Sequence, residues 1–480
     1  MLSLNRSNFP GRTYPDRILQ FGEGNFLRAF IDWQIDLLNE HTDLDAGVVA
    51  IRPRNSPPKR TLNTQDGLYT TLVRGRNNAG DVVSEARLIR SVNREIYPAQ
   101  QKEAFLALAR DEAVRFIFSN TTEAGIQYAA GEEIGGMPAS FPGKLTLLLL
   151  ERWRHFSGAS DKGWTMIPCE LIDDNGGALK TLVLRYAREW QLPEAFSQWI
   201  ERDNTFCSTL VDRIVTGYPD NAAEIEQQLG YHDAYLVAAE VYYLLVIQGP
   251  DWLQQALRLD RYPLNIRLVN DIRPFKEQKV AILNGAHTAL VPVAFLAGLN
   301  TVGEAMADRQ IAAFCEQMLR QEVVPTLKFS DELDVYVDTV LTRFRNPFIC
   351  HQLQSIALNS MTKFRTRLLP QLLGYLHEQG TPPECLTFTF AALLVYYRGR
   401  RDGGAYPLQD EPAWLQRFHA LWSQVDAGQL TARQLVEAVL GNAPHWGENL
   451  NESEGVAAAV TAHLQRILAE GVRAALASVT

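Results

Sequence analysis

The sequence predicts an α/β protein in which a parallel-sheet N-terminal domain precedes a mostly α-helical C-terminal domain. The chain opens with a strand, a glycine turn, a helix and a second strand, which is the order of a βαβ unit. From about Phe275 onward, apolar residues recur with the helical period. A length of 480 residues favours two large domains, and we expect them to span residues 1–274 and 275–480.

The opening unit is defined by its apolar pattern. Ile18–Phe21 and Gly47–Ile51 are short apolar runs typical of buried strands. Between them, apolar residues over 26–38 have the spacing of one helix. Further strands are expected at 68–73, 115–118, 164–169, 211–216 and 241–247, and helices at 178–190, 311–324, 349–369 and 455–476.

Composition limits the classes of function. The net charge of −9 argues against a nucleic-acid-binding surface. Five scattered cysteines without a C-x-x-C pair predict free thiols in a reducing cytoplasm, and the N-terminus has no apolar signal region. No uninterrupted apolar run reaches about 18 residues, so no membrane span is expected. The histidines are dispersed, so we expect no metal site. The oligomeric state stays open.

Gly22 and Gly24 stand at the first strand-to-helix junction. There, the first glycine of a dinucleotide-binding turn allows the sharp bend, and the second lets a pyrophosphate approach the helix N-terminus. The third glycine of that motif is absent, because Leu27 occupies its position. A plain loop that uses glycine for positive φ is the alternative. Arg52 follows the second strand where an acidic residue is usual, which leaves NAD and NADP both open.

Lys279, Asn284 and His287 bring an amine, an amide and an imidazole within nine residues of a largely apolar stretch. At about 100° per helical residue they fall near about 0°, 140° and 80°, on one half of a helix. Lysine serves as a general acid/base once burial lowers its pKa, and asparagine can polarise a carbonyl oxygen. This set suits ketone reduction without a metal. The alternative is a surface helix whose polar face carries these residues.

Two weaker features involve single polar or cationic side chains. Asn175, in an Asn-Gly pair, follows a strand and precedes a helix, where an α/β sheet presents ligand groups; it could equally be a loop asparagine. Arg343, Lys363 and Arg365 in the helical half could bind a substrate carboxylate or lie on a solvated face.

Together these motifs resemble the mannitol dehydrogenase family of polyol-specific long-chain dehydrogenase/reductases. The run from Gly22 to Ala29 looks like its G-x-G-x-F-x-R motif, and Lys279-x4-Asn284-x2-His287 looks like its K-x4-N-x2-H motif. Residues 211–214 and 343–347 match further family blocks in the same order, so the resemblance covers nearly the whole chain.

The resemblance implies a Rossmann-like N-terminal domain that binds NAD, a helical C-terminal domain, no zinc, and a small-molecule keto-uronate/aldonate substrate. By position, Lys279 would be the general acid/base, Asn284 would stabilise the alkoxide, and His287 would orient the substrate or the lysine. Asn175 would be a second donor, although Glu170-Leu171 departs from the family's Asp-Asn. The dinucleotide would be wrapped by Ile18, Leu19, Gln20, Phe21, Gly22, Glu23, Gly24, Asn25, Phe26, Leu27, Arg28 and Ala29.

Other outcomes stay open beside this one. Another polyol or sugar-acid dehydrogenase of the family would share these motifs. A non-catalytic protein that senses NAD or a sugar acid would keep the fold, but it would have no need of Lys279.

Overall fold

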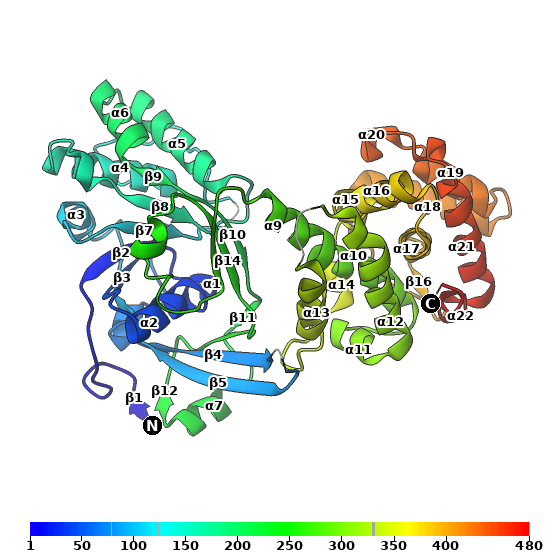
Figure 1. The fold of residues 1–480 in the computed structure, drawn as a ribbon, viewed down its shortest axis with the longest axis horizontal. Helices are drawn as coiled ribbons and strands as arrows, with labels where there is room; N and C mark the ends of the chain where they lie inside the picture. Colours follow the sequence, from blue (N-terminus) through cyan, green and yellow to red (C-terminus); the bar gives the residue numbers. More distant parts are fainter. Residues whose placement is uncertain (78, 123, 329–331, 480) are drawn as a thin grey trace. The chain divides into compact units, whose positions relative to one another are not determined.

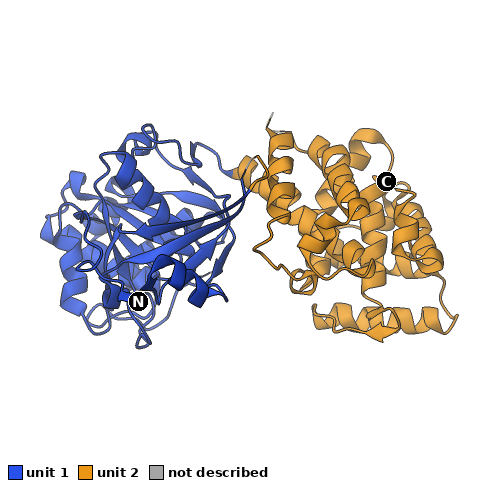
Figure 2. Cartoon of the chain, turned by 90° about the horizontal axis from the view of Figure 1, so that it is seen from below, with its two compact units in different colours: residues 1–77, 82–272 blue, residues 78–81, 273–480 orange. Residues whose placement is uncertain are grey.

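The computed structural model describes residues 1–77, 79–122, 124–328 and 332–479. Two compact units make up the chain (Figures 1 and 2). Unit 1 comprises Met1–Asn77 and Val82–Ile272, and unit 2 comprises residues 273–480 with the short segment 78–81. Unit 1 holds the large sheets, and unit 2 is almost entirely helical.

Unit 1 is built on a six-stranded parallel sheet with the strand order β6-β3-β2-β7-β8-β9. In chain order this is 3-2-1-4-5-6, the arrangement of a doubly wound dinucleotide-binding fold, which confirms the predicted α/β class. The strands are β2 (Asp16–Phe21), β3 (Gly47–Ile51), β6 (Val92–Ile96), β7 (Phe116–Ser119), β8 (Thr165–Pro168) and β9 (Thr205–Phe206).

Helices cover both faces of this sheet, and alternate side chains of each strand therefore enter different cores. Ile18 belongs to the core formed with α2 (Ile31–His41), whereas Leu19 belongs to the core formed with α4 (Phe141–His155) and α5 (Asn175–Glu189). The remaining helices of unit 1 are α1 (Asn25–Arg28), η1 (Leu62–Gln65), α3 (Lys102–Ala107), η2 (Leu108–Arg110), η3 (Ser160–Lys162), α6 (Glu194–Asp203), α7 (Ala222–Leu229) and α8 (Leu253–Ala256).

Smaller sheets complete unit 1, with the orders β11-β13-β4-β5, β10-β14-β15 and β1-β12. Their strands are β1 (Leu2–Ser3), β4 (Tyr69–Arg76), β5 (Val82–Ile89), β10 (Ser208–Asp212), β11 (Val215–Gly217), β12 (Tyr231–His232), β13 (Val237–Ala239), β14 (Leu244–Gln248) and β15 (Ile266–Val269). The predicted single strand 211–216 is wrong, because Arg213 interrupts it. The Arg213 guanidinium donates to the Glu240 carbonyl, and the chain passes from one sheet into another.

Unit 2 packs around a long helix that runs from α9 through η4 into α10, and around α17, whose whole circumference is buried. Its helices are α9 (Arg273–Gln278), η4 (Lys279–Asn284), α10 (Gly285–Leu296), α11 (Val302–Ala307), α12 (Arg309–Gln317), η5 (Met318–Val323), η6 (Val324–Thr326), α13 (Leu333–Phe344), α14 (Leu353–Ile356), α15 (Ser360–Arg367), α16 (Leu369–Gln379), α17 (Glu384–Tyr396), α18 (Pro412–Asp426), α19 (Ala432–Leu440), α20 (Ala443–Trp446), η7 (Leu450–Glu452), α21 (Val456–Glu470) and α22 (Val472–Leu476). A hairpin of β16 (Arg400–Arg401) and β17 (Gly404–Ala405) completes the unit.

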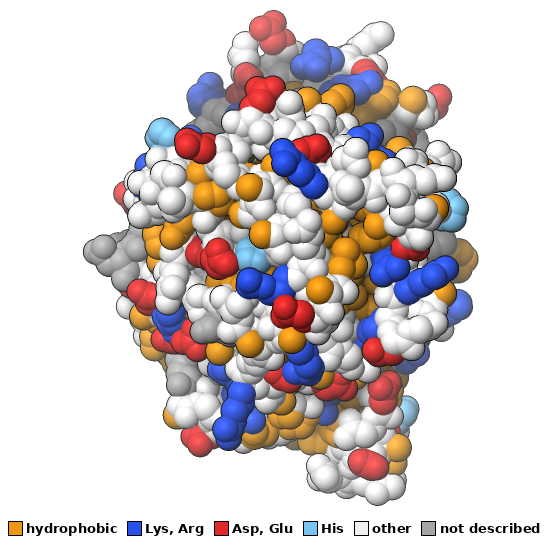
Figure 3. All heavy atoms as spheres, turned by 90° about the vertical axis from the view of Figure 1, so that its right-hand side faces the viewer, with side chains coloured by type: hydrophobic (Ala, Val, Ile, Leu, Met, Phe, Trp, Pro, Cys, Tyr) orange, Lys and Arg blue, Asp and Glu red, His pale blue; other side chains and the backbone are white. Residues whose placement is uncertain are grey.

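The helix Arg273–Leu296 is 24 residues long and apolar enough to cross a membrane by length and composition alone. However, 72% of its most apolar window is buried inside the protein, as in the core helix of a soluble fold. The face of unit 2 in Figure 3 carries acidic and basic side chains interspersed with apolar ones, as solvated surfaces do.

Three predicted helices are broken in the structure. The helix over 455–476 divides into α21 and α22 at Gly471, which has a φ of 82°. The helix over 26–38 divides into α1 and α2, because side chains take the carbonyls that would continue it: Tyr69 Oη lies 2.9 Å from the Arg28 oxygen, and Arg213 Nη1 lies 2.7 Å from the Ala29 oxygen. The helix over 349–369 divides into α14, α15 and the start of α16. Asn359 has a left-handed φ of 56° before α15, and Pro370 opens α16.

Candidate functional site

The glycine turn begins where β2 ends. Gly22 has φ +122°, and a Cβ there would lie 2.8 Å from the Asn120 carbonyl oxygen, so this position requires glycine. Gly24 has an ordinary φ of −70°, and a Cβ there would meet no heavy atom within 4 Å. The fold therefore does not demand glycine at 24, whereas close approach by a phosphate group would.

A buried polar network lies beneath the turn. Gln20 Nε2 donates to the Gly22 oxygen at 3.1 Å and to Asp32 Oδ2 at 3.3 Å, and Tyr69 Oη lies 2.9 Å from the same carboxylate oxygen. Burial raises the pKa of Asp32 to about 7. We did not predict this network. Its only signals in the sequence are a glutamine in an apolar strand and an aspartate in an apolar helix.

The predicted cofactor-binding residues fall into two groups, one with buried and one with accessible side chains. Six of them have buried side chains and can meet a cofactor only through their backbone: Ile18, Leu19, Gln20, Phe21, Leu27 and Ala29. Arg28 is also buried, and its Nε donates to the Glu23 carbonyl, so it braces the turn from inside. Burial lowers the pKa of Arg28. The accessible side chains are those of Glu23, Asn25 and Phe26, beside Gly24.

Arg52, at the end of β3, is held between two carboxylates. Its Nη1 lies 3.1 Å from Glu23 Oε1, and its Nη2 lies 3.3 Å from Glu95 Oε1. Burial raises the pKa of Glu23, and the Arg52 charge opposes that rise. The positive charge that could have met a cofactor 2′-phosphate is thus already neutralised.

Asn175 opens α5 at the carboxyl end of β8, and its side chain is buried. Its Nδ2 lies 3.1 Å from both the Pro168 and the Glu170 oxygens, and its Oδ1 accepts from the Thr209 amide at 2.9 Å. These bonds hold the ends of β8 and β10 together. The role of Asn175 as a donor to substrate stays a prediction, and it lies in a different unit from Lys279.

In unit 2, Lys279–Asn284 forms a π-helical turn between α9 and α10. The i→i+5 bonding of such a turn brings residues five apart closer to one face than the about 140° of an α-helix. Lys279, Asn284 and His287 are each partly accessible, whereas Ala281–Leu283 and Gly285–Ala286 are buried. From Ala281 to Phe295 the helix is buried except at Asn284 and His287, whereas Lys279 lies at the end of its accessible N-terminal part.

Aromatic rings fix the imidazole of His287. The ring of Phe344 stacks on it with centroids 4.2 Å apart, and the His351 ring meets it edge-on at 5.2 Å. The pKa of His351 is lowered mainly by burial and to a smaller extent by the charge of Lys363. Neither ring was predicted, because both lie more than fifty residues from His287 in the sequence.

The cationic candidates of unit 2 have different surroundings. Arg343 is buried, and Arg365 Nη1 donates to the His445 carbonyl at 2.9 Å. Lys363 is half-buried on the same helix as a further cation that we did not predict, Arg367, whose Nη1 contacts Thr288 Oγ1 at 3.3 Å.

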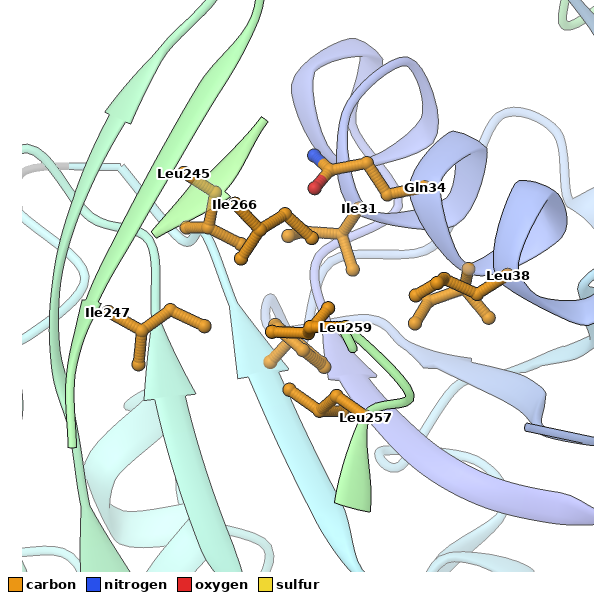
Figure 4. A pocket seen from close by; sticks show the side chains of 10 residues that line it. Ile31, Gln34, Leu38, Leu245, Ile247, Leu257, Leu259 and Ile266 are labelled. Carbon is orange, nitrogen blue, oxygen red and sulfur yellow. The ribbon is translucent and has the colours of Figure 1, made fainter. Parts of the chain in front are cut away.

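Two other kinds of site are poorly supported. Within the described ranges, no group of three or more His, Cys, Asp or Glu side chains is placed to hold a metal ion. A small pocket between α2 and the β14–β15 strands has an apolar lining apart from Gln34 (Figure 4). It offers no titratable group for acid/base chemistry.

Comparisons with known proteins agree with the two-unit architecture. Residues 16–261 match the mannitol dehydrogenase Rossmann domain, and residues 271–468 match the mannitol dehydrogenase C-terminal domain. The altronate oxidoreductase of Cronobacter sakazakii is 61% identical over 99% of both chains, and that of Yersinia enterocolitica is 59% identical over 100% of both.

Two solved structures share the fold. A substrate-free D-sorbitol dehydrogenase superposes with a TM-score of 0.79 at 22% identity, covering 97% of this chain and 95% of its own. Pseudomonas fluorescens mannitol 2-dehydrogenase, in a ternary complex with NAD and D-mannitol, gives 0.66 at 22% identity over 99% of both chains. The chain is therefore an oxidoreductase that belongs to the mannitol dehydrogenase family.

Proposed function

We propose that this enzyme interconverts D-tagaturonate and D-altronate with NADH and NAD, a step of galacturonate catabolism. The observation that carries the proposal is the partly accessible set of Lys279, Asn284 and His287, of which Asn284 and His287 interrupt an otherwise buried run from Ala281 to Phe295. The full-length similarity to altronate oxidoreductases supports this choice of substrate within the family.

The residues of unit 1 fit a dinucleotide. The backbone from Gly22 to Phe26 would hold its pyrophosphate, because Gly24 leaves open space at the start of a helix. Arg52, neutralised by Glu23 and Glu95, gives a 2′-phosphate little attraction, which favours NAD over NADP. When bound, the nicotinamide supplies or accepts the hydride.

In unit 2, Lys279 would exchange the proton. During reduction its ammonium gives a proton to the former ketone oxygen, and during oxidation its amine takes one from the hydroxyl. The Asn284 amide donates a hydrogen bond to that oxygen as negative charge develops. The Phe344 stack holds the His287 ring in one plane, so that its edge can orient the substrate hydroxyls.

The test compares NADH oxidation with D-tagaturonate, D-fructuronate and D-fructose, and then compares NADH with NADPH on the best substrate. We expect the highest kcat/KM with tagaturonate and NADH. A preference for fructuronate or fructose would assign the chain to another activity of the family. NADH binding without turnover of any of the three would indicate a sensor.

A further inference from the structure

Lys363 and Arg367 are two half-buried cations one helical turn apart on α15. Neither makes an ion pair with a carboxylate anywhere in the described part of the chain. Lys363 Nζ donates to the Ile356 oxygen at 2.7 Å, and Arg367 Nη1 donates to Thr288 Oγ1 at 3.3 Å. Burial lowers the pKa of both groups, and the charge of Arg367 lowers that of Lys363 further, against a smaller opposing effect of the Asp410 carboxylate. This pair of like charges is costly to the fold alone.

Both side chains keep most of their donors for a ligand. An ammonium has three N–H groups and a guanidinium has five, and the contacts above use one from each. A planar carboxylate matches the guanidinium fork bidentately, and a second cation nearby strengthens the attraction. The chemistry of the pair is therefore that of an anion-binding site.

The pair lies beside the polar triplet. Thr288, which contacts Arg367, directly follows His287, and its hydroxyl donates to the Asn284 oxygen at 2.8 Å. A Cβ on Gly285 would lie 3.6 Å from the Arg367 carbonyl oxygen, so α15 packs closely on the start of α10. Lys363 is linked to the triplet through His351: its charge lowers the pKa of His351, and the His351 ring contacts that of His287.

We propose that Arg367, assisted by Lys363, binds the carboxylate of the sugar-acid substrate and so selects sugar acids over neutral polyols. This inference rests on the proposed function, since it assigns a carboxylate to the molecule that Lys279 and Asn284 act on. Arg365, on the same helix, is engaged with the His445 carbonyl and takes no part. A cofactor phosphate has similar chemistry, and the test below separates the two.

Steady-state kinetics of Arg367→Gln with tagaturonate and NADH provide the test, with Arg365→Gln as a control of equal charge change. Loss of a charge-assisted contact is expected to raise KM for tagaturonate about 10- to 100-fold in Arg367→Gln and to leave KM for NADH unchanged. Arg365→Gln should stay within about twofold of the native enzyme. Lys363→Met should give a smaller rise, and Arg367→Lys should recover part of the loss.

An unchanged tagaturonate KM in Arg367→Gln, or equal effects in both glutamine variants, would overturn the inference. A rise confined to the NADH KM would assign the site to a cofactor phosphate instead. Calorimetric binding of altronate and of its uncharged analogue altritol to the NAD-loaded protein separates the two proposals. Suppose that the native protein turns over none of the three ketones but binds altronate more tightly than altritol, and that Arg367→Gln loses this preference. That result would contradict only the proposed function.

Discussion

The imidazole of His287 lies face to face with the ring of Phe344, with centroids 4.2 Å apart and planes inclined by 26°. The two residues come from α10 and α13, so this contact links the polar triplet to a second helix. A stacked ring keeps the imidazole from rotating, and it leaves only the ring edge for polar contacts.

Replacing Phe344 with leucine keeps an apolar side chain of similar volume but removes the stack. We expect kcat to fall about 10-fold, because the His287 ring becomes free to rotate, while the unfolding free energy falls by no more than about 1.5 kcal/mol. Phe418→Leu is the control, since Phe418 stacks on Tyr397 in the same unit, away from the triplet. Equal kcat in the two variants would show that the stack has no catalytic role.

Lys279→Met tests the proton donor. Without the amine, kcat should fall about 10²- to 10⁴-fold, because the variant loses the group proposed to transfer the proton. NADH affinity, measured by fluorescence titration, should not change, since the glycine turn lies in the other unit. Lys276→Met, three residues earlier in α9, serves as the control and should retain activity. Substantial turnover in Lys279→Met would exclude lysine as the general acid/base.

The two glycines of the turn should respond differently to alanine. Gly24→Ala should leave the melting temperature unchanged, because its Cβ meets open space, but should raise KM for NADH by obstructing the pyrophosphate. Gly22→Ala should destabilise unit 1 itself, because φ is +122° and the Asn120 oxygen lies 2.8 Å away. Unaltered NADH binding in Gly24→Ala would place the cofactor elsewhere.

Asp32 should make stability depend on pH. Its pKa is raised by burial to about 7 in the folded protein, against about 3.9 in the unfolded chain. Between these values the folded state holds a proton that the unfolded state has lost, so stability decreases as pH rises. From pH 5 to pH 8 the loss should be about 3 kcal/mol.

Asp32→Asn removes this titration, and its amide can donate to Gln20 Oε1, which has no partner in the native network. We expect the variant to unfold at higher urea than the native protein at pH 8 and at similar urea at pH 5. Asp43→Asn, at an exposed aspartate that is ion-paired with Arg258 and Arg261, should keep the native pH dependence. An unchanged pH dependence in Asp32→Asn would mean that this carboxyl titrates near its ordinary pKa.

Features that depend on neighbouring residues were predictable from the sequence. The apolar run at Ile18–Phe21, the glycine turn after it and the strand Gly47–Ile51 predict the βαβ unit, because each residue's role is set within a few positions. The polar triplet at 279–287 was also recognisable, since polar groups in an apolar helix are conspicuous.

Features that depend on distant residues were not predictable. The break between α1 and α2 is made by Tyr69 and by Arg213, which lies 184 positions from Ala29. Arg367 was overlooked beside Arg365, because nothing in the sequence tells which of two neighbouring arginines turns toward α10. The neutralisation of Arg52 likewise needs Glu95, from another strand.

The π-helical turn Lys279–Asn284 has a consequence for insertions and deletions. Removing one residue from Val280–Leu283 would restore ordinary α-helical bonding and keep all three polar side chains. Lys279 and Asn284 would then lie four residues apart, which at about 100° per residue separates them by about 40°, so they would still share one face. The common face of the triplet is therefore defined by helical phase as much as by residue identity. A variant that keeps every residue but loses the π-helical turn should lose this face, because a five-residue spacing in an α-helix separates Lys279 and Asn284 by about 140°.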